Sequence, residues 1–212
     1  MAKSTQTQEK KVEILRAATA LIKQRGLQAL SFDAVAKQAG LSRQLVRYYF
    51  TDLDALILEL CTFLGNEYRN ILVAGILEMR QVERLKFFLD FFFDLADAHP
   101  MPDNLEAYDS LLAYAVGSAD LRERLCDQYK TLGQVVVHEL AIAHPELEDH
   151  ACEELSFLFV SMMHAHWSFV ASLGYSRDHG RLTRQAIDRL IKSYIDDSTQ
   201  GPVIRAPWSR DT

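Results

Sequence analysis

The sequence predicts an all-α protein with a small N-terminal three-helix domain and a larger C-terminal helical domain. Its 212 residues are 49% hydrophobic and 25% charged, a composition that supports a buried core and argues against disorder. The 9 glycines and 5 prolines separate long runs with helical spacing, and these runs carry no β-strand signals. The helical spacing of the apolar residues and the glycines and prolines between the runs together therefore predict an all-α fold.

Nine helices are expected, most of them bounded by a glycine, a proline or a capping residue. The fourth, which Asp52 begins as a cap, leaves the small domain and enters the large one, so that motion at one end can be felt at the other. The expected ranges are residues 8–25, 32–39, 43–49, 53–79, 81–98, 103–116, 119–143, 147–173 and 180–196.

The second and third helices form a helix-turn-helix. Gly40 follows the first of them at a position that favours a residue tolerant of the left-handed conformation. Ser31 and Ser42 each precede a helical run, where a hydroxyl accepts a hydrogen bond from an otherwise unpaired N–H group. Two capped helices joined by a short turn are the motif that places a second helix in the major groove of DNA.

The third helix has an apolar and a polar face. At about 100° per residue, Leu45, Val46, Tyr49 and Phe50 fall on one arc of roughly 140°. The opposite arc carries the side chains that suit a duplex: Arg pairs with guanine or phosphate, Gln with adenine, and a Tyr hydroxyl with phosphate. A solvated polar face is the alternative interpretation. The residues of this opposite arc are Arg43, Gln44, Arg47 and Tyr48.

The charge distribution favours the DNA interpretation. Residues 1–50 carry nine Lys and Arg against three acidic residues, whereas residues 51–212 carry fourteen against twenty-six, for a net charge of −6. An acidic chain that concentrates positive charge at one end is expected when that end meets phosphates.

Residues 14–57, ILRAATALIKQRGLQALSFDAVAKQAGLSRQLVRYYFTDLDALI, resemble the DNA-binding domain of the TetR family of bacterial transcriptional regulators. The chain departs from the family pattern at Gln44, Leu45 and Arg47, so its operator is expected to be atypical. At Leu53, where the family often has a phosphate-binding Lys, one backbone contact is expected to be missing, and Arg47 or Tyr48 is the candidate to replace it. The helix face and the resemblance together predict DNA contacts by Ser31, Ser42, Arg43, Gln44, Leu45, Arg47, Tyr48 and Thr51.

The second domain is rich in aromatic residues, and the resemblance implies a small-molecule pocket there. Rings at helical spacing form a plain core more often than a pocket, so both interpretations stay open. The candidate ligand-binding residues are Phe88, Phe92, Tyr108, Leu112, His164 and Trp167.

An apolar stripe marks the last expected helix. One interpretation is that other helices of the same chain cover this stripe. The resemblance implies instead a homodimer joined by the last two helices of each subunit. The candidate interface residues are Leu182, Ala186, Ile187, Leu190, Ile191 and Tyr194.

The sequence lacks the residue patterns of metal sites and of common catalytic sites. His164 and His166 are about 200° apart on a helix and cannot chelate one ion together, and neither a phosphate loop, a nucleophile elbow nor an HExxH motif occurs. We therefore expect neither enzymatic activity nor a metal or cofactor. The polar N-terminus and the lack of a long apolar segment indicate a cytoplasmic protein without a membrane association.

The sequence thus predicts a ligand-responsive regulator, most simply a repressor that binds a palindromic operator as a homodimer and is released by a small apolar or aromatic effector. Residues 1–52 would bind DNA, residues 53–197 would bind the effector and dimerise, and residues 198–212 would form a polar tail. The alternative is an all-α ligand-binding or enzymatic protein whose basic N-terminal domain binds a protein partner.

Overall fold

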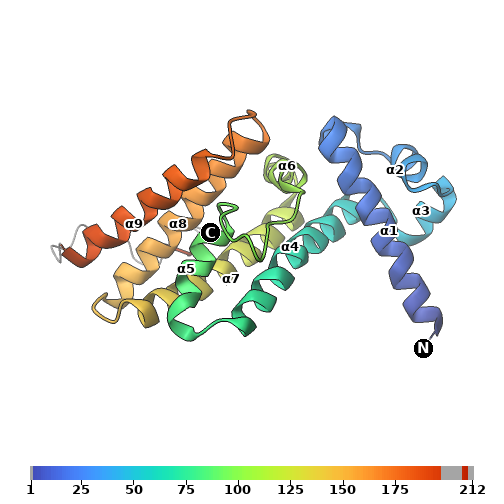
Figure 1. Cartoon of the computed structure of the whole chain (residues 1–212). Coiled ribbons are helices and arrows are strands. Elements are labelled where there is room, and N and C mark those ends of the chain that lie inside the picture. The colour runs from blue at the N-terminus through green and yellow to red at the C-terminus, as the bar shows by residue number, and fades with distance from the viewer. Residues whose placement is uncertain (1, 197–206, 210–212) are drawn as a thin grey trace. The chain divides into compact units, whose positions relative to one another are not determined.

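All regular elements in the described part of the chain are helical, which confirms the all-α prediction (Figure 1). The computed structural model describes residues 2–196 and 207–209. Its elements are α1 (Ala2–Arg25), the 3₁₀ turn η1 (Leu27–Ala29), α2 (Phe32–Ala39), α3 (Arg43–Tyr49), α4 (Leu53–Glu78), α5 (Gln81–Phe91), α6 (Leu105–Ala115), α7 (Ala119–Ala143), α8 (Asp149–Ala171) and α9 (His179–Asp196).

The chain divides into two compact units. Unit 1 comprises Met1–Glu67 and Pro102–Cys126, and unit 2 comprises Tyr68–Met101 and Asp127–Thr212. Helices α4 and α7 each contribute residues to both units. The sequence predicts a boundary between a DNA-binding and an effector-binding domain at residues 52 and 53. The two compact units are defined by spatial contacts and meet inside α4 and α7, so they do not test this functional boundary, which stays a prediction. Most of the expected tail, residues 198–212, lies outside the described residues.

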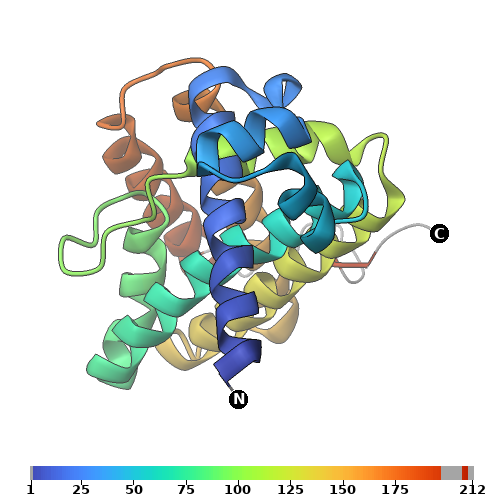
Figure 2. The ribbon, with the colours of Figure 1, turned by 90° about the vertical axis from the view of Figure 1, so that its right-hand side faces the viewer.

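The core of unit 1 begins with the buried face of α1. Ile14, Ala18 and Ile22 recur at a spacing of four residues and are at most 2% exposed. This face packs on α2, and α2 packs on α3, so the three helices form one cluster (Figure 2). Val35 of α2 and Val46 of α3 are completely buried. The two helices of the turn are thus fixed by apolar contacts on one side only.

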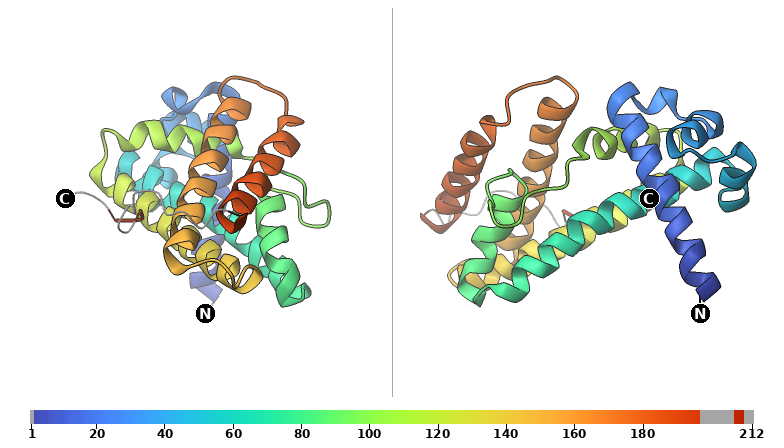
Figure 3. Two further views of the ribbon diagram at one scale, coloured as in Figure 1. Left: turned by 90° about the vertical axis from the view of Figure 1, so that its left-hand side faces the viewer. Right: turned by 45° about the vertical axis from the view of Figure 1, so that its right-hand side comes forward.

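Aromatic side chains dominate the core of unit 2. Phe91 and Phe93 are at most 2% exposed, and Phe91 meets Phe92 edge to face with ring centroids 5.1 Å apart. Phe93 meets Phe159 of α8 in the same manner at 6.1 Å. Helices α8 and α9 lie side by side in this unit (Figure 3). Such edge-to-face ring contacts stabilise a core beyond the area that they bury.

Helix α5 ends at Phe91, earlier than the expected end near residue 98. Asp94 adopts a left-handed conformation with φ of 57°. The Leu95 N–H then donates to the Asp90 carbonyl and the Asp94 N–H to the Phe91 carbonyl, at 3.0 and 3.1 Å. This pair of bonds is the Schellman arrangement that stops a helix. The predicted end was wrong because only glycine and proline were taken as signals that stop a helix. Asp also tolerates the left-handed conformation that ends α5.

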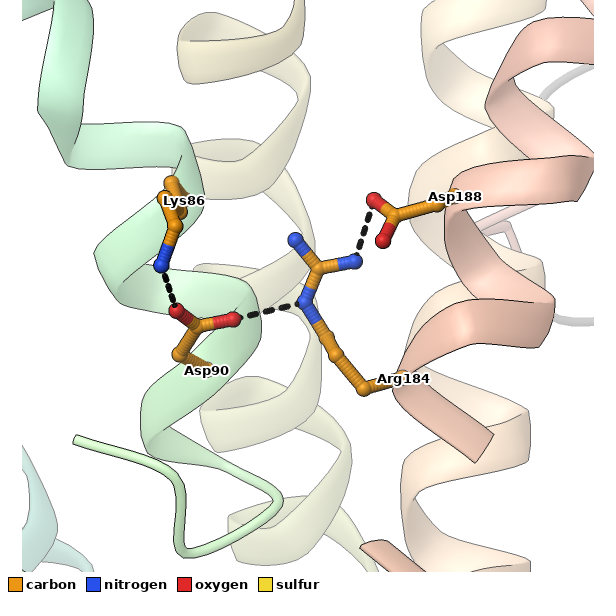
Figure 4. A network of polar contacts seen from close by, with 4 residues as sticks. All are labelled: Lys86, Asp90, Arg184 and Asp188. Atoms are coloured by element: carbon orange, nitrogen blue, oxygen red, sulfur yellow. Dashed lines mark hydrogen bonds and ion pairs between the residues drawn. The ribbon is translucent and has the colours of Figure 1, made fainter. Parts of the chain in front are cut away.

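A buried arginine links α9 to α5. Arg184 is 8% exposed, and its Nε donates to Asp90 Oδ1 at 2.9 Å (Figure 4). A second guanidinium nitrogen pairs with Asp188 one turn further along α9, and Lys86 pairs with the other oxygen of Asp90. A buried charge is tolerated only when it is paired, so this network fixes the position of α9 on α5.

None of the helices within the described ranges combines the length and the hydropathy needed to span a bilayer.

Candidate nucleic-acid interface

The turn between α2 and α3 has the geometry that the sequence predicts. Ser31 caps α2, since its Oγ accepts a hydrogen bond from the Ala34 N–H at 3.2 Å. Gly40 ends α2 with φ of 66° and ψ of 29°, and the Leu41 N–H donates to the Ala36 carbonyl at 2.9 Å. The left-handed conformation at Gly40 reverses the chain within a few residues and sets the direction of α3.

Helix α3 starts at a second cap and has two distinct faces. The Ser42 Oγ accepts a hydrogen bond from the Leu45 N–H at 3.2 Å. Val46 and Phe50 are at most 2% exposed, whereas Tyr48 is 79% exposed. Leu45 is half-buried at the border between the faces. The exposed side chains are those expected to meet DNA, Arg43, Gln44, Arg47 and Tyr48.

The charges on this face are weakly engaged by the protein itself. Arg43 Nη1 lies 3.2 Å from Asp33 Oδ2, and the two side chains are 56% and 68% exposed. An ion pair in that setting contributes little because water screens both charges. The Arg43 guanidinium can therefore exchange Asp33 for a phosphate or a guanine at small cost.

The start of α4 is also capped. Asp52 Oδ1 accepts a hydrogen bond from the Ala55 N–H at 2.8 Å, and the Thr51 hydroxyl donates to Asp52 Oδ2 at 3.2 Å. Thr51 is exposed directly after α3. Its hydroxyl, like those of Ser31 and Ser42, serves the local backbone structure, and all three residues remain candidates for DNA contact.

One contact near this interface was not foreseen from the sequence. The Tyr114 hydroxyl donates to Asp54 Oδ1 at 2.6 Å and so joins α6 to the first turn of α4 within unit 1. This hydrogen bond raises the pKa of Tyr114. The two residues are sixty positions apart in the chain, and no local pattern relates them.

The comparisons with known proteins agree with this geometry. Residues 14–60 match the profile described as bacterial regulatory proteins, tetR family. A TetR-family regulator from Rhodococcus sp. superposes with a TM-score of 0.70 at 20% identity, over 88% of this chain and 99% of that one. A TetR regulator from Haloarcula marismortui gives 0.76 at 16% identity, over 88% and 98%. The match to the tetR family model covers residues 14–60, and the fold of these regulators extends further along the chain.

The TetR fold thus extends over most of the chain. A regulator from Saccharomonospora viridis, solved in complex with choline, superposes with a TM-score of 0.72 at 19% identity, over 87% of this chain and 96% of that one. No curated protein matches the chain in sequence. These similarities show the fold of TetR-family regulators and, over residues 14–60, their DNA-binding domain pattern.

The expected ligand-binding residues fall in both compact units. Phe88, Phe92 and Trp167 are at most 3% exposed in unit 2. Trp167 Nε1 donates to the Phe92 carbonyl at 2.8 Å, and the two rings lie 5.8 Å apart. His164, also in unit 2, is half-buried with its Nδ1 3.1 Å from the Tyr129 hydroxyl. The other two candidates lie in unit 1, where Tyr108 is buried and Leu112 is half-buried.

The expected dimerisation stripe divides between two environments. Ile187 and Ile191 are 1% and 6% exposed and pack into their own chain. Leu182 is 61% exposed. The remaining three members, Ala186, Leu190 and Tyr194, are half-buried. The Tyr194 hydroxyl donates a hydrogen bond to Glu154 Oε2 of α8 at 3.0 Å.

Exposed apolar side chains on and after α8 were missed by the sequence analysis. Leu158 and Phe169 of α8 are 36% and 53% exposed, and Leu173 beyond its end is 64% exposed. With Met162 and Ala165 they recur every three or four residues along one face of the helix. Because α8 is apolar on nearly all sides, its sequence does not distinguish this face from the buried one.

Trp208, near the C-terminus, covers another part of this apolar surface. Its ring meets Phe157 of α8 edge to face with centroids 5.3 Å apart. A Cβ atom added at Gly133 of α7 would lie 2.2 Å from Trp208 Cζ2, so the indole ring approaches the α7 backbone closely. Two tryptophans, Trp167 and Trp208, are therefore packed in unit 2.

Proposed function

We propose that the protein is a repressor that binds a palindromic operator as a homodimer and is released by a small apolar or aromatic effector. The observation that carries this proposal is the outward face of α3, where two guanidiniums, an amide and a phenol are exposed on a capped helix of a helix-turn-helix. Such a helix fits the major groove, where Arg reads guanine and Gln reads adenine.

In the proposed mode of binding, Arg43 and Gln44, in the first turn of α3, reach base edges. The N-terminal residues of a recognition helix are those that usually contact bases. Arg47, Tyr48 and Thr51 lie further along and would bind phosphates, which position the helix without reading sequence.

The homodimer is proposed to form through α8 and α9. The apolar face of α8 and the exposed Leu182 of α9 leave apolar surface in contact with water, and surface of this kind marks sites of protein association. A two-fold dimer presents two α3 helices to two half-sites. Both partners would contribute the same surface.

The effector is proposed to act on the ring cluster around Phe92 and Trp167 in unit 2. These rings are packed against each other, so an apolar or aromatic ligand would bind by replacing ring contacts with its own. The similar regulator from S. viridis was solved in complex with choline, which supports binding of a small organic molecule by a protein of this fold. Binding would change the separation of the two α3 helices and so release the operator.

The experiment that tests this function is selection of bound duplexes from a random library, followed by footprinting. If the protein binds a palindromic operator, we expect the selected duplexes to share an inverted repeat. Its half-sites should lie about 34–36 Å apart, or a multiple of that spacing, along one face of the duplex. The alternative, in which the basic domain binds a protein partner, predicts no enriched duplex. Activation in place of repression would appear as increased transcription from a promoter that carries the selected site.

A further inference from the structure

A cleft in unit 1 lies outside both the α3 surface and the ring cluster of unit 2. Its volume is about 310 Å³, at the small end of the range of ligand pockets. Helix α1 forms one wall, and α4 and the residues that lead into α6 form the other. Its lining residues are Arg16, Thr19, Ala20, Lys23, Phe63, Glu67, Pro102, Asp103 and Asn104.

Asn104 lines this cleft and carries a buried side-chain oxygen without a hydrogen-bond partner among the described residues. The residue is 4% exposed and precedes the first turn of α6 without making a side-chain cap. Its Nδ2 donates to Glu67 Oε2 at 2.6 Å, which fixes the orientation of the amide. No group in the described residues donates to Oδ1, which is itself buried. Buried carbonyl groups are nearly always hydrogen-bonded, so an oxygen of this kind in a cleft calls for a donor from outside the chain.

Glu67 places a second acceptor beside Asn104. Burial raises the pKa of its carboxyl group, while the Asn104 hydrogen bond and the charge of Arg16 lower it. A carboxylate that has lost part of its hydration is stabilised by a nearby positive charge. The wall formed by α4 and Asn104 is therefore rich in acceptors and suited to a cation.

The α1 wall has the opposite character. Arg16, Thr19 and Lys23 follow one another at a spacing of three or four residues and so share a face of the helix. Lys23 Nζ lies 2.8 Å from Asp103 Oδ2, an ion pair at the rim in which the Asp103 side chain is 79% exposed. Arg16 is exposed on the same face and can receive an anionic group.

We propose that this cleft binds a small zwitterion, an amine-carboxylate whose ammonium group donates to Asn104 Oδ1 and the Glu67 carboxylate and whose carboxylate pairs with Arg16. The two acidic and two basic side chains in the lining balance each other, so a ligand with no net charge leaves the cleft neutral. The opposed donor and acceptor walls fix the orientation of the ligand.

The position of the cleft suggests a regulatory role that rests on the proposed function. Helix α1 packs on α2 and also on α6. A ligand that joins α1 to α4 and to the start of α6 restrains the helices that support α3. Its occupancy therefore changes operator affinity, and operator binding changes ligand affinity by the same factor.

The test is calorimetric titration of the full-length protein with three probes of increasing spacing between the charged groups: glycine, 4-aminobutanoate and 6-aminohexanoate. We expect one of them to bind with one site per chain. Butanoate and butylamine, which each lack one of the two charged groups, should bind at least about tenfold more weakly, since each loses one charge-assisted contact worth about a factor of ten.

Substitutions locate the bound probe. Asn104→Leu and Glu67→Gln should each weaken binding about tenfold or more, and the matched change Asn70→Leu, at an exposed position of α4, should leave it unchanged. Because Asn104→Leu alters a buried position, Arg16→Ala provides a second variant at an exposed position that does not threaten the fold. It should weaken the amino acids and leave butylamine unaffected.

Two results would overturn the site: the absence of binding by all three probes at millimolar concentration, or binding that Asn104→Leu, Glu67→Gln and Arg16→Ala all leave unchanged. The titration contains no DNA, so it is independent of the proposed function. Duplex affinity is then measured with and without the bound probe. An unchanged affinity in a protein that binds both would overturn the regulatory role.

Discussion

The outward face of α3 and the outward face of α8 and α9 are both exposed surfaces whose chemistry is unusual for their position. The first presents Arg43, Gln44, Arg47 and Tyr48, and the second presents Leu158, Phe169 and Leu182. Each set includes a strongly exposed side chain, Tyr48 at 79% in the first and Leu182 at 61% in the second. The difference in chemistry indicates different partners, a polyanion for α3 and a second apolar surface for α8 and α9.

The largest expected effect concerns the apolar surface. Phe169→Asp and Leu182→Asp should each split the dimer, because an unpaired carboxylate in an apolar interface costs roughly 3–5 kcal/mol. Light scattering of the purified variants measures the change in mass. Leu77→Asp is the matched control, since Leu77 is 81% exposed in α4 and lies outside the proposed interface. Dimeric, folded Phe169→Asp and Leu182→Asp variants would move the interface elsewhere.

The next effect concerns the polar surface. Arg43→Ala or Gln44→Ala should reduce affinity for the selected operator by about 1–3 kcal/mol and leave binding to random duplexes largely intact. Fluorescence anisotropy with both duplexes measures the difference. Arg69→Ala, which removes the same charge from an exposed position of α4 outside both surfaces, serves as the control. Equal losses on both duplexes would assign Arg43 or Gln44 to the phosphate backbone.

The turn that directs α3 can be weakened without touching either surface. Gly40→Ala should lower the free energy of unfolding by about 1–2 kcal/mol, because the residue has φ of 66° and an added Cβ has space but an unfavourable backbone. Thermal or urea unfolding measures this cost, and the dimer should persist. Unchanged stability would mean that the turn relaxes to another conformation.

The smallest effect concerns the part of the apolar surface that the chain covers itself. Gly133→Ala should displace the Trp208 ring, because the new Cβ would lie 2.2 Å from it, and should shift the tryptophan emission to longer wavelength. The same change in a Trp208→Phe background reports Trp167 alone and should leave the emission unaltered. A shift of equal size in that background would mean that the substitution perturbs the ring core instead.

The two surfaces also differ in how far the sequence predicted them. The α3 surface follows from local patterns: a glycine, two serine caps and a polar arc within twenty residues. The α8 surface does not, because a helix that is apolar on all sides carries no periodicity that separates its buried and exposed faces. Likewise, Gly40 and Asp94 stop their helices with the same hydrogen bonds, yet only the glycine is a recognisable signal.

Contacts between distant residues explain the remaining differences. The Arg184–Asp90 pair, the Tyr114–Asp54 hydrogen bond and the cleft at Asn104 each join segments that are far apart in the chain. Such contacts depend on the packing of whole helices, and a single sequence contains no local trace of them. The candidate ligand residues illustrate the same limit, since the aromatic content of the expected second domain grouped Tyr108 with Trp167 although they belong to different units.

The central claim is that the α3 face binds DNA phosphates and bases, and the salt dependence of duplex binding tests it most directly. Anisotropy titrations of a labelled duplex at several salt concentrations should give a steep linear fall of log affinity with log salt. Arg47→Ala should reduce that slope by about 0.9, the value for one lost phosphate contact. Duplex binding that is absent, or that is insensitive both to salt and to Arg47→Ala, would contradict the assignment of α3 as the recognition helix.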